Sequence, residues 1–329
     1  MFSSRREFLA GLGAASVLAA VPRAAQASAS CPFRLSVIND EISPDFDHAC
    51  SVAANDFGLS WIELRSMWNK NVTELNADEV DRSRQILEKY KLRVTDIASP
   101  LFKVNWPGAP QSKEGPRRDP SQVDADFKHQ DEVLERSIEL CKAFQTDRIR
   151  CFDFWRIEDQ KPYRDAIDEK LTEAARICAK QNIVLILENE MACNTGSGAE
   201  AIAVLMAVQE PNLMLNWDPG NSATFAGDTP YPDDYNQLPK HRIGHCHCKD
   251  TIRKPDGKFE WAPVGGGIID WVGQFKAFQR DGYRFAVSLE THWHGGKPKP
   301  GSSMSVSEAS TRVSMKGLKE ALAKAGATC

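Results

Sequence analysis

Four short apolar runs decide the fold of this chain: IVLILENE at residues 183–190, NLMLNWDPGN at 212–221, RIGHCHCKD at 242–250 and FAVSLETHW at 285–293. Parallel strands that are buried on both faces have this continuous apolar character. At or near its carboxyl end, each run carries one side chain of a metal-binding type: Glu188, Asp218, His247 and Glu290. A charged group there is costly unless it is hydrogen-bonded, paired or bound to a cation. The repetition predicts one metal site at the carboxyl ends of four successive strands.

Apolar strand-like segments alternate with helical patterns along the rest of the chain. We expect strands near 33–38, 61–65, 92–98, 148–154, 183–188, 212–217, 242–248 and 284–290, and helices near 45–57, 77–89, 125–145, 161–180, 197–209, 233–239, 270–281 and 306–327. Strict alternation of this kind predicts a single-domain α/β fold, the (β/α)8 TIM barrel. A doubly wound open sheet alternates in the same way and is the alternative.

The first 29 residues have the pattern of a twin-arginine export signal. Arg5 and Arg6 precede an apolar stretch that ends at Val21, and small residues follow in a pattern typical of a cleavage site. The apolar stretch is too short for a stable membrane span. The sequence therefore predicts a signal peptide over 1–29, a barrel over 30–329, export by the twin-arginine machinery, and a periplasmic or secreted protein.

Charge and cysteine content narrow the class of protein. Removing residues 1–29 takes away three arginines and one glutamate, so the formal net charge changes from −4 to −6. An acidic chain is a poor nucleic-acid binder, and we expect no nucleic-acid partner. All nine cysteines lie after residue 29, with no regular spacing. Buried packing is the expected role for them, in preference to a disulfide framework or a thiolate site.

Strand parity predicts which side chains point into the barrel, because alternate residues of a strand face the same side. One inward row contains His245, His247 and Lys249, and another contains Ser288, Glu290 and His292. Glu190 shares the parity of Glu188. In WIELR at 61–65, we favour an internal ion pair between Glu63 and Arg65 over contact of Glu63 with substrate.

Two long connections, 103–124 and 292–305, would lie on the same face of the barrel as the metal. Loops of this length are often functional. Each could be a lid over the site or a solvent-exposed loop with no such role. The glycine-rich PVGGGIIDW at 263–271 leads into a helix capped by Asp270. It could cradle a phosphate, although we favour simple turn packing.

The ligand set suits one divalent ion of the harder kind, namely Mn²⁺, Mg²⁺ or Co²⁺, with Zn²⁺ as a further possibility. A cation that chelates a substrate hydroxyl and its neighbouring carbonyl acidifies the carbon between them and stabilises an enediolate. Two carboxylates on opposite sides of that carbon could then remove a proton from one face and return it to the other.

The motifs ENE, WDPGN, HCHCKD and SLETH resemble, in this order, those of the xylose-isomerase-like TIM barrels, the sugar phosphate isomerase and epimerase group. The resemblance covers nearly all of the chain after residue 29. It implies the same four metal ligands, with Glu188 and Glu290 as the catalytic pair. It also implies a substrate contact for Arg253, six residues after the metal-binding histidine.

The chain departs from the family pattern at two positions. Glu190 stands where many relatives have histidine, and Asn221 stands where epimerases often have histidine. Both departures concern the substrate more than the metal. A helix cap or an Asx turn is an alternative role for Asn221.

From these observations we expect a metal-dependent isomerase or epimerase of an unphosphorylated sugar or sugar-like polyol. Candidate substrate-binding residues are Lys249, Arg253, Asn221, Glu63, His245 and His292. For Lys249 and Arg253 the alternatives are pairing with Asp250 and a place in a solvated loop. A metal-dependent lyase or dehydratase acting on a 3-keto-glycoside or keto-polyol is the second hypothesis, and a non-catalytic carbohydrate-binding barrel is the third. The expected partner is a small carbohydrate, and a homo-oligomer is possible.

Overall fold

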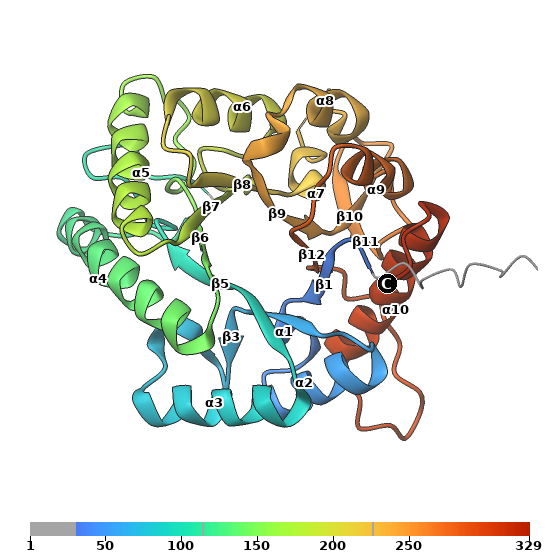
Figure 1. Cartoon of the computed structure of the whole chain (residues 1–329). Helices are drawn as coiled ribbons and strands as arrows, with labels where there is room; N and C mark the ends of the chain where they lie inside the picture. The colour runs from blue at the N-terminus through green and yellow to red at the C-terminus, as the bar shows by residue number, and fades with distance from the viewer. Residues whose placement is uncertain (1–30, 114, 226) are drawn as a thin grey trace, which may run out of the picture.

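The computed structural model describes residues 31–113, 115–225 and 227–329. Eight parallel strands form the centre of the molecule and helices surround them (Figure 1). The strands are β1 (Arg34–Val37), β2 (Trp61–Leu64), β5 (Arg93–Leu101), β6 (Arg148–Cys151), β7 (Val184–Glu188), β8 (Leu213–Trp217), β9 (Ile243–Cys248) and β12 (Ala286–Leu289). Seven of them lie within the segments expected from the sequence, and β5 extends beyond its expected segment, 92–98, to Leu101. The predicted signal peptide lies outside the described residues.

The sheet curls round until its first and last strands meet. Its strand order is β1-β12-β9-β8-β7-β6-β5-β2, and Ile38 and Glu63 form a parallel bridge that joins the ends of β1 and β2. An open sheet would leave these two strands apart. The predicted (β/α)8 barrel is therefore confirmed, and the doubly wound alternative is wrong.

The outer helices follow the strands, as the alternation predicted. Their bounds are α1 (Asn39–Ile42), α2 (Phe46–Ser51), α3 (Ala77–Tyr90), α4 (Pro120–Phe144), α5 (Arg164–Ala179), α6 (Gly198–Ala207), α7 (Pro219–Ser222), α8 (Tyr235–Gln237), α9 (Trp271–Arg280) and α10 (Val306–Lys324). Side chains of Asn76, Asp119 and Ser197 accept hydrogen bonds from backbone amides and so begin α3, α4 and α6. No helix within the described part of the chain is long and apolar enough to cross a membrane.

Two small hairpins interrupt the alternation and were not expected. β3 (Ser66–Met67) pairs with β4 (Lys70–Asn71), and β10 (Asp250–Arg253) pairs with β11 (Phe259–Ala262). Because each hairpin directly follows a barrel strand, both add structure to the face where the strands end.

The cysteines partly contradict the expectation. Cys31 and Cys329 form a disulfide that joins the first and last described residues of the chain. The other seven are buried and free, as the packing role predicts. The two disulfide partners are 298 residues apart in sequence, so no local spacing could reveal the pair.

Candidate metal centre

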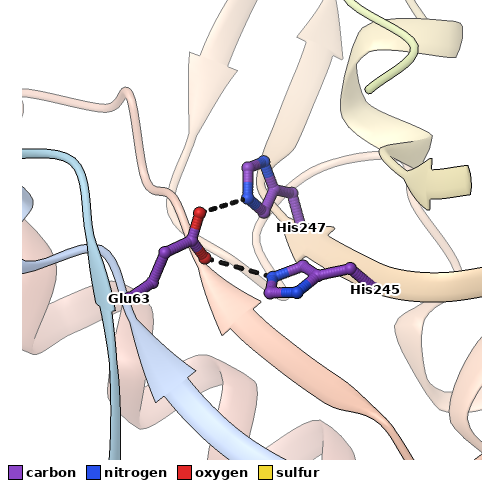
Figure 2. A group of neighbouring side chains, drawn as sticks. All are labelled: Glu63, His245 and His247. Carbon is purple, nitrogen blue, oxygen red and sulfur yellow. Dashed lines mark hydrogen bonds and ion pairs between the residues drawn. The ribbon is translucent and has the colours of Figure 1, made fainter. Parts of the chain in front are cut away.

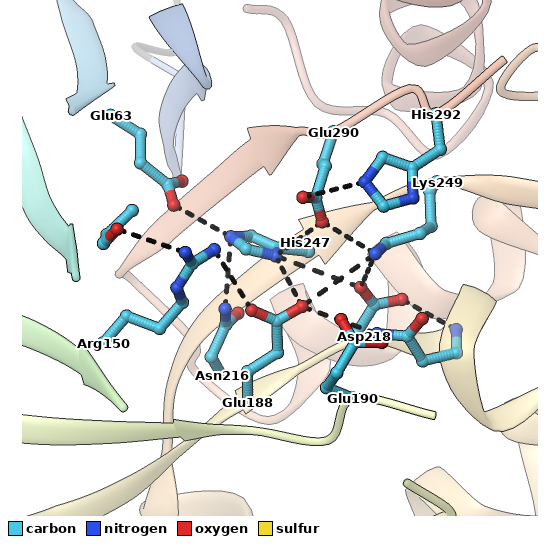
Figure 3. Close-up of polar contacts among 12 residues, drawn as sticks. Glu63, Arg150, Glu188, Glu190, Asn216, Asp218, His247, Lys249, Glu290 and His292 are labelled. Atoms are coloured by element: carbon cyan, nitrogen blue, oxygen red, sulfur yellow. Dashed lines mark hydrogen bonds and ion pairs between the residues drawn. The ribbon is translucent and has the colours of Figure 1, made fainter. Parts of the chain in front are cut away.

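The four predicted ligands meet at one end of the barrel. Glu188 is the last residue of β7, Asp218 directly follows β8, His247 lies in β9, and Glu290 directly follows β12. These four residues are 0–3% exposed. One candidate ligand atom from each lies within 4.8 Å of the others, and Figure 3 shows the side chains pointing toward a common centre.

Each of the three carboxylates has one oxygen held by the protein and one directed to the centre. Asp218 Oδ1 accepts a hydrogen bond from the backbone amide of Asn221 at 2.9 Å. Glu188 Oε2 accepts from Arg150 at 3.3 Å, and Glu290 Oε1 accepts from Arg65 at 2.7 Å. The inner oxygens face the ring of His247, whose Nδ1 is 3.3 Å from Glu188, 3.1 Å from Glu290 and 3.9 Å from Asp218. The protein thus fixes the orientation of every carboxylate in the cluster.

Lys249 places its ammonium beside the same inner oxygens. Its Nζ is 2.9 Å from Asp218 and 2.7 Å from Glu290. These distances make ion pairs, but the angles do not make hydrogen bonds. Burial disfavours the charged form, and the neighbouring carboxylates outweigh it and raise the pKa of Lys249. Lys249 therefore does not pair with Asp250, which was the alternative.

Burial and neighbouring charge also separate the pKa values of the carboxylates. Burial raises the pKa of Asp218 to about 6, because Lys249 only partly compensates. For Glu188, burial is outweighed by His247 and Arg150, which bring its pKa to about 2. The carboxylates of one cluster therefore differ in how readily they take up a proton.

The donor set fits a divalent cation. Asp218 Oδ2, His247 Nδ1 and Glu290 Oε2 are buried and have no hydrogen-bond partner. Lys249 supplies an opposite charge to the two carboxylate oxygens, but buried polar atoms that lack hydrogen bonds are still costly. A cation bound by them would remove that cost. Three carboxylates and one imidazole suit Mn²⁺, Mg²⁺, Co²⁺ or Zn²⁺, and no thiolate is available in the cluster for a softer ion.

The expected substrate-binding residues occupy three different places. Asn221 and His292 lie in the cluster, with Asn221 Nδ2 3.4 Å from Glu188 and His292 Nε2 3.2 Å from Glu290. Glu63 and His245 are fully buried and bond to each other at 3.1 Å. Arg253 lies in β10 and donates to the carbonyls of Ala223 and Phe225. The substrate contacts of Asn221, His292, Lys249 and Arg253 stay predictions.

The favoured Glu63–Arg65 ion pair is wrong. Glu63 lies inside the barrel and pairs with His245 and His247. Arg65 follows the end of β2 and pairs with Asp40, Glu41 and Glu290. The two residues share a parity in an ideal strand, but the strand ends at Leu64, so parity does not extend to Arg65.

Two further expectations, for Glu190 and for the glycine-rich loop at 263–271, differ from what the structure shows. Glu190 lies beyond the end of β7, where strand parity no longer applies, and pairs with Lys103 at 3.4 Å. The glycine-rich loop binds an internal anion, since the amides of Gly265, Gly267 and Ile269 donate to the carboxylate of Asp250. These amides are not available to a phosphate. Asp270 caps α9, as expected.

Sequence reasoning missed three residues near the cluster. Arg150 and Asp96 are buried charged residues of the barrel strands β6 and β5, so a charge within a predicted strand could have identified them. Trp261 gave no such signal. It lies in β11, with its ring 5.3 Å from that of His292 and 5.5 Å from Lys249 Nζ.

Residues 52–320 match the family model described as "Xylose isomerase-like TIM barrel". Because the match spans most of the chain, the protein belongs to the xylose isomerase-like TIM barrel family. A curated Escherichia coli (strain K12) protein, named "Putative L-ribulose-5-phosphate 3-epimerase SgbU", is 23% identical over 244 residues, which cover 70% of this chain and 84% of that protein. The family and this relative indicate an enzyme.

Two solved structures share the fold. The IOLI protein with a bound zinc atom aligns with a TM-score of 0.67 at 16% identity, over 89% of this chain and 99% of that one. The D-psicose 3-epimerase from Clostridium cellulolyticum H10, solved with D-tagatose, aligns with a TM-score of 0.62 at 15% identity, over 90% of this chain and all of that one (100%).

Proposed function

We propose that the protein is a divalent-metal-dependent epimerase or isomerase of an unphosphorylated sugar or sugar-like polyol. The observation that carries the proposal is the pair of glutamates, Glu188 and Glu290, in a cluster that has the ligands for one cation. The strands β7 and β12 are separated by β8 and β9 in the sheet. The two carboxylates therefore approach the centre from different sides of the barrel mouth.

The residues of the chain divide the reaction among them. When bound, the cation would polarise a substrate carbonyl and a neighbouring hydroxyl and so acidify the carbon between them. Glu188 and Glu290 would remove the proton from that carbon and return it to the other face. Lys249 lies against the inner oxygens, and it would hold a developing oxyanion of the substrate. His292 and Asn221 would bind hydroxyl groups at the edge of the cluster.

One observation and one prediction favour a substrate without a phosphate. The amides of the glycine-rich loop are directed at Asp250, and the predicted export signal would take the enzyme to a compartment where phosphorylated sugars are scarce. The D-psicose 3-epimerase crystallised with D-tagatose shares the fold, which adds support. The relative with a sugar-phosphate name is the reason to include phosphorylated sugars in any test.

We infer periplasmic or secreted localisation from the twin-arginine pattern, and the Cys31–Cys329 disulfide supports it, because disulfides persist in oxidising compartments. Replacing Arg5 and Arg6 with lysine should leave the precursor in the cytoplasm of a bacterium that has the twin-arginine machinery. Fractionation and immunoblotting would measure the distribution. Normal periplasmic accumulation of this variant would remove the inference.

The proposed reaction can be tested through proton exchange in D₂O. The metal-loaded enzyme is incubated with a panel of ketoses, aldoses, their phosphates and 3-keto-glycosides, and deuterium incorporation is followed by NMR. We expect exchange at one carbon next to a carbonyl, accompanied by the epimer or the isomer. Exchange with loss of a leaving group would instead identify a lyase, and no exchange with any member of the panel would contradict the proposal.

A further inference from the structure

A second buried cluster lies beneath the four ligands, and the proposed reaction does not use it. The carboxylate of Glu63 binds two histidines of β9 at once, His247 Nε2 at 3.0 Å and His245 Nε2 at 3.1 Å (Figure 2). All three side chains are 0% exposed. Glu63 therefore joins the metal cluster to the interior of the barrel.

The carboxylate of Glu63 determines which nitrogen carries the proton in the rings of His245 and His247. An ionised carboxylate only accepts hydrogen bonds, so each histidine must present a protonated Nε2 to Glu63. The opposite nitrogen of His247, Nδ1, is the atom that faces Glu188 and Glu290. A metal ligand needs a nitrogen with a free electron pair in that position. The carboxylate of Glu63 thus selects the ring form that leaves Nδ1 available.

We propose that Glu63 is a positioning residue that orients His247 and holds it in the tautomer that binds the cation. Metal-binding histidines commonly donate their second N–H to a carboxylate, and loss of that partner typically lowers metal affinity about 10–100-fold. The proposal replaces the expected substrate contacts of Glu63 and His245. It rests on the metal centre of the proposed function but not on the reaction.

His245 and Asp96 extend the cluster by one layer. His245 Nδ1 lies 3.6 Å from Asp96 Oδ1 without a hydrogen bond between them, and Asp96 Oδ1 accepts a hydrogen bond from the hydroxyl of Thr95 at 2.8 Å. His245 donates to the second oxygen of Glu63, so the carboxylate cannot rotate without losing one of its two partners. His245 therefore holds Glu63 in the plane that His247 requires.

The side-chain amide of Asn216, as it is oriented, would favour the other tautomer of His247. Its side-chain nitrogen lies 3.1 Å from His247 Nε2, and an amide N–H pointing there would require an unprotonated Nε2 and hence a protonated Nδ1. That arrangement would set the electron pair of Nε2 against the oxygen of Glu63. Asn216 Oδ1 is buried without a partner, and rotating the amide by half a turn would let this oxygen face the ring N–H instead. The carboxylate of Glu63 and the rotated amide of Asn216 would then both accept from a protonated Nε2 of His247.

The tautomer can be read directly in the wild-type protein. The chain has seven histidines, and long-range ¹H–¹⁵N correlation NMR distinguishes the two nitrogens of each ring. With Zn²⁺ as the only addition, we expect His247 to carry its proton on Nε2 and to bind through Nδ1. A proton on Nδ1 in the Zn²⁺-loaded wild type would overturn the proposal, and this measurement requires no variant to fold.

A pair of matched variants tests the contribution to affinity. In Glu63→Gln, the side chain keeps one acceptor oxygen, which serves only one of the two histidine rings, and it turns an N–H toward the second ring. We therefore expect Zn²⁺ affinity to fall about 10–100-fold. Glu308→Gln is the control, because Glu308 is a buried carboxylate of α10 that also binds a histidine, His48, at 2.8 Å. It should retain wild-type Zn²⁺ affinity.

The outcomes separate positioning from general stability. Equal losses of affinity in both variants would show a nonspecific effect of removing a buried charge and would overturn the proposal. A folded Glu63→Gln protein with wild-type affinity and an unchanged His247 spectrum would overturn it too. Because no substrate is present, failure of the proposed reaction in the D₂O panel would leave these results unaffected.

Discussion

The two oxygens of each carboxylate in the cluster have different neighbours. Glu188 gives one oxygen to Arg150 and the other to the centre, and Glu290 gives one to Arg65 and the other to the centre. The arginines neutralise part of the charge and fix the side chains before any cation arrives. This preorganisation lowers the cost of bringing three carboxylates together in a buried site.

Substituting glutamine for Glu188 or Glu290 tests their role as proton acceptors. Glutamine has one oxygen, so it can satisfy the arginine or the cation but not both. We therefore expect weaker metal binding in Glu188→Gln and Glu290→Gln and, at saturating metal, a loss of turnover of about 10²–10⁴-fold, typical of a lost general base. Steady-state kinetics on the substrate found in the D₂O panel would measure this.

The two glutamine variants should also differ from each other. For an epimerase, each retains a base on one face only, so each should exchange deuterium into one epimer and not the other. Glu308→Gln, which changes a buried carboxylate outside the four-ligand cluster, should keep wild-type turnover. Near-wild-type rates in both Glu188→Gln and Glu290→Gln would mean that another base, such as Lys249 or His292, carries the proton.

At the scale of elements, the barrel strands were predictable because parallel strands buried on both faces are continuous apolar runs. The carboxyl ends of β7, β8, β9 and β12 carried the ligands, and the alternation placed them on one face. The β10–β11 hairpin was not predictable, because Thr251 and Trp261 pair across a turn with no distinctive apolar pattern.

Side-chain partners that lie across the barrel could not be predicted from the sequence either. Glu63 was placed inside correctly, but its binding to His245 and His247 depends on how β2 and β9 face each other across the interior. Arg65 was given the wrong partner because β2 ends one residue before it. Strand parity predicts the direction of a side chain and leaves its neighbour undetermined.

The disulfide is the clearest example of a long-range partnership, and it gives a stability prediction. Cys31 precedes β1 and Cys329 follows α10, so the bond closes the chain around the whole barrel. Replacing either cysteine with serine should lower the free energy of unfolding by about 2–4 kcal/mol, chiefly because the unfolded chain gains freedom. Denaturant unfolding under oxidising conditions would measure the change.

The double variant provides the control for this prediction. If the two cysteines act only through their bond, Cys31→Ser with Cys329→Ser should be no less stable than either single variant. Adding reductant should affect the wild type and leave the variants unchanged. Single variants as stable as the oxidised wild type would contradict the prediction.

At the scale of the whole molecule, every candidate ligand lies on the face where the barrel strands end, which is the usual location of active sites in this fold. The Glu63 cluster lies deeper in the same barrel and connects to the ligands through His247. We therefore expect function in this chain to depend on the strand ends and the loops that follow them.

We propose that Glu188, Asp218, His247 and Glu290 bind one divalent cation, and the stoichiometry and affinity of Mn²⁺ binding test this proposal. Both are measured by equilibrium dialysis on the chain without residues 1–29. We expect one equivalent to bind wild type and to raise its thermal stability, because a ligand that binds only the native state stabilises it. His247→Ala should bind far more weakly while it keeps the circular dichroism of the barrel. A His247→Ala protein that holds one equivalent as tightly as wild type would show that the site lies elsewhere.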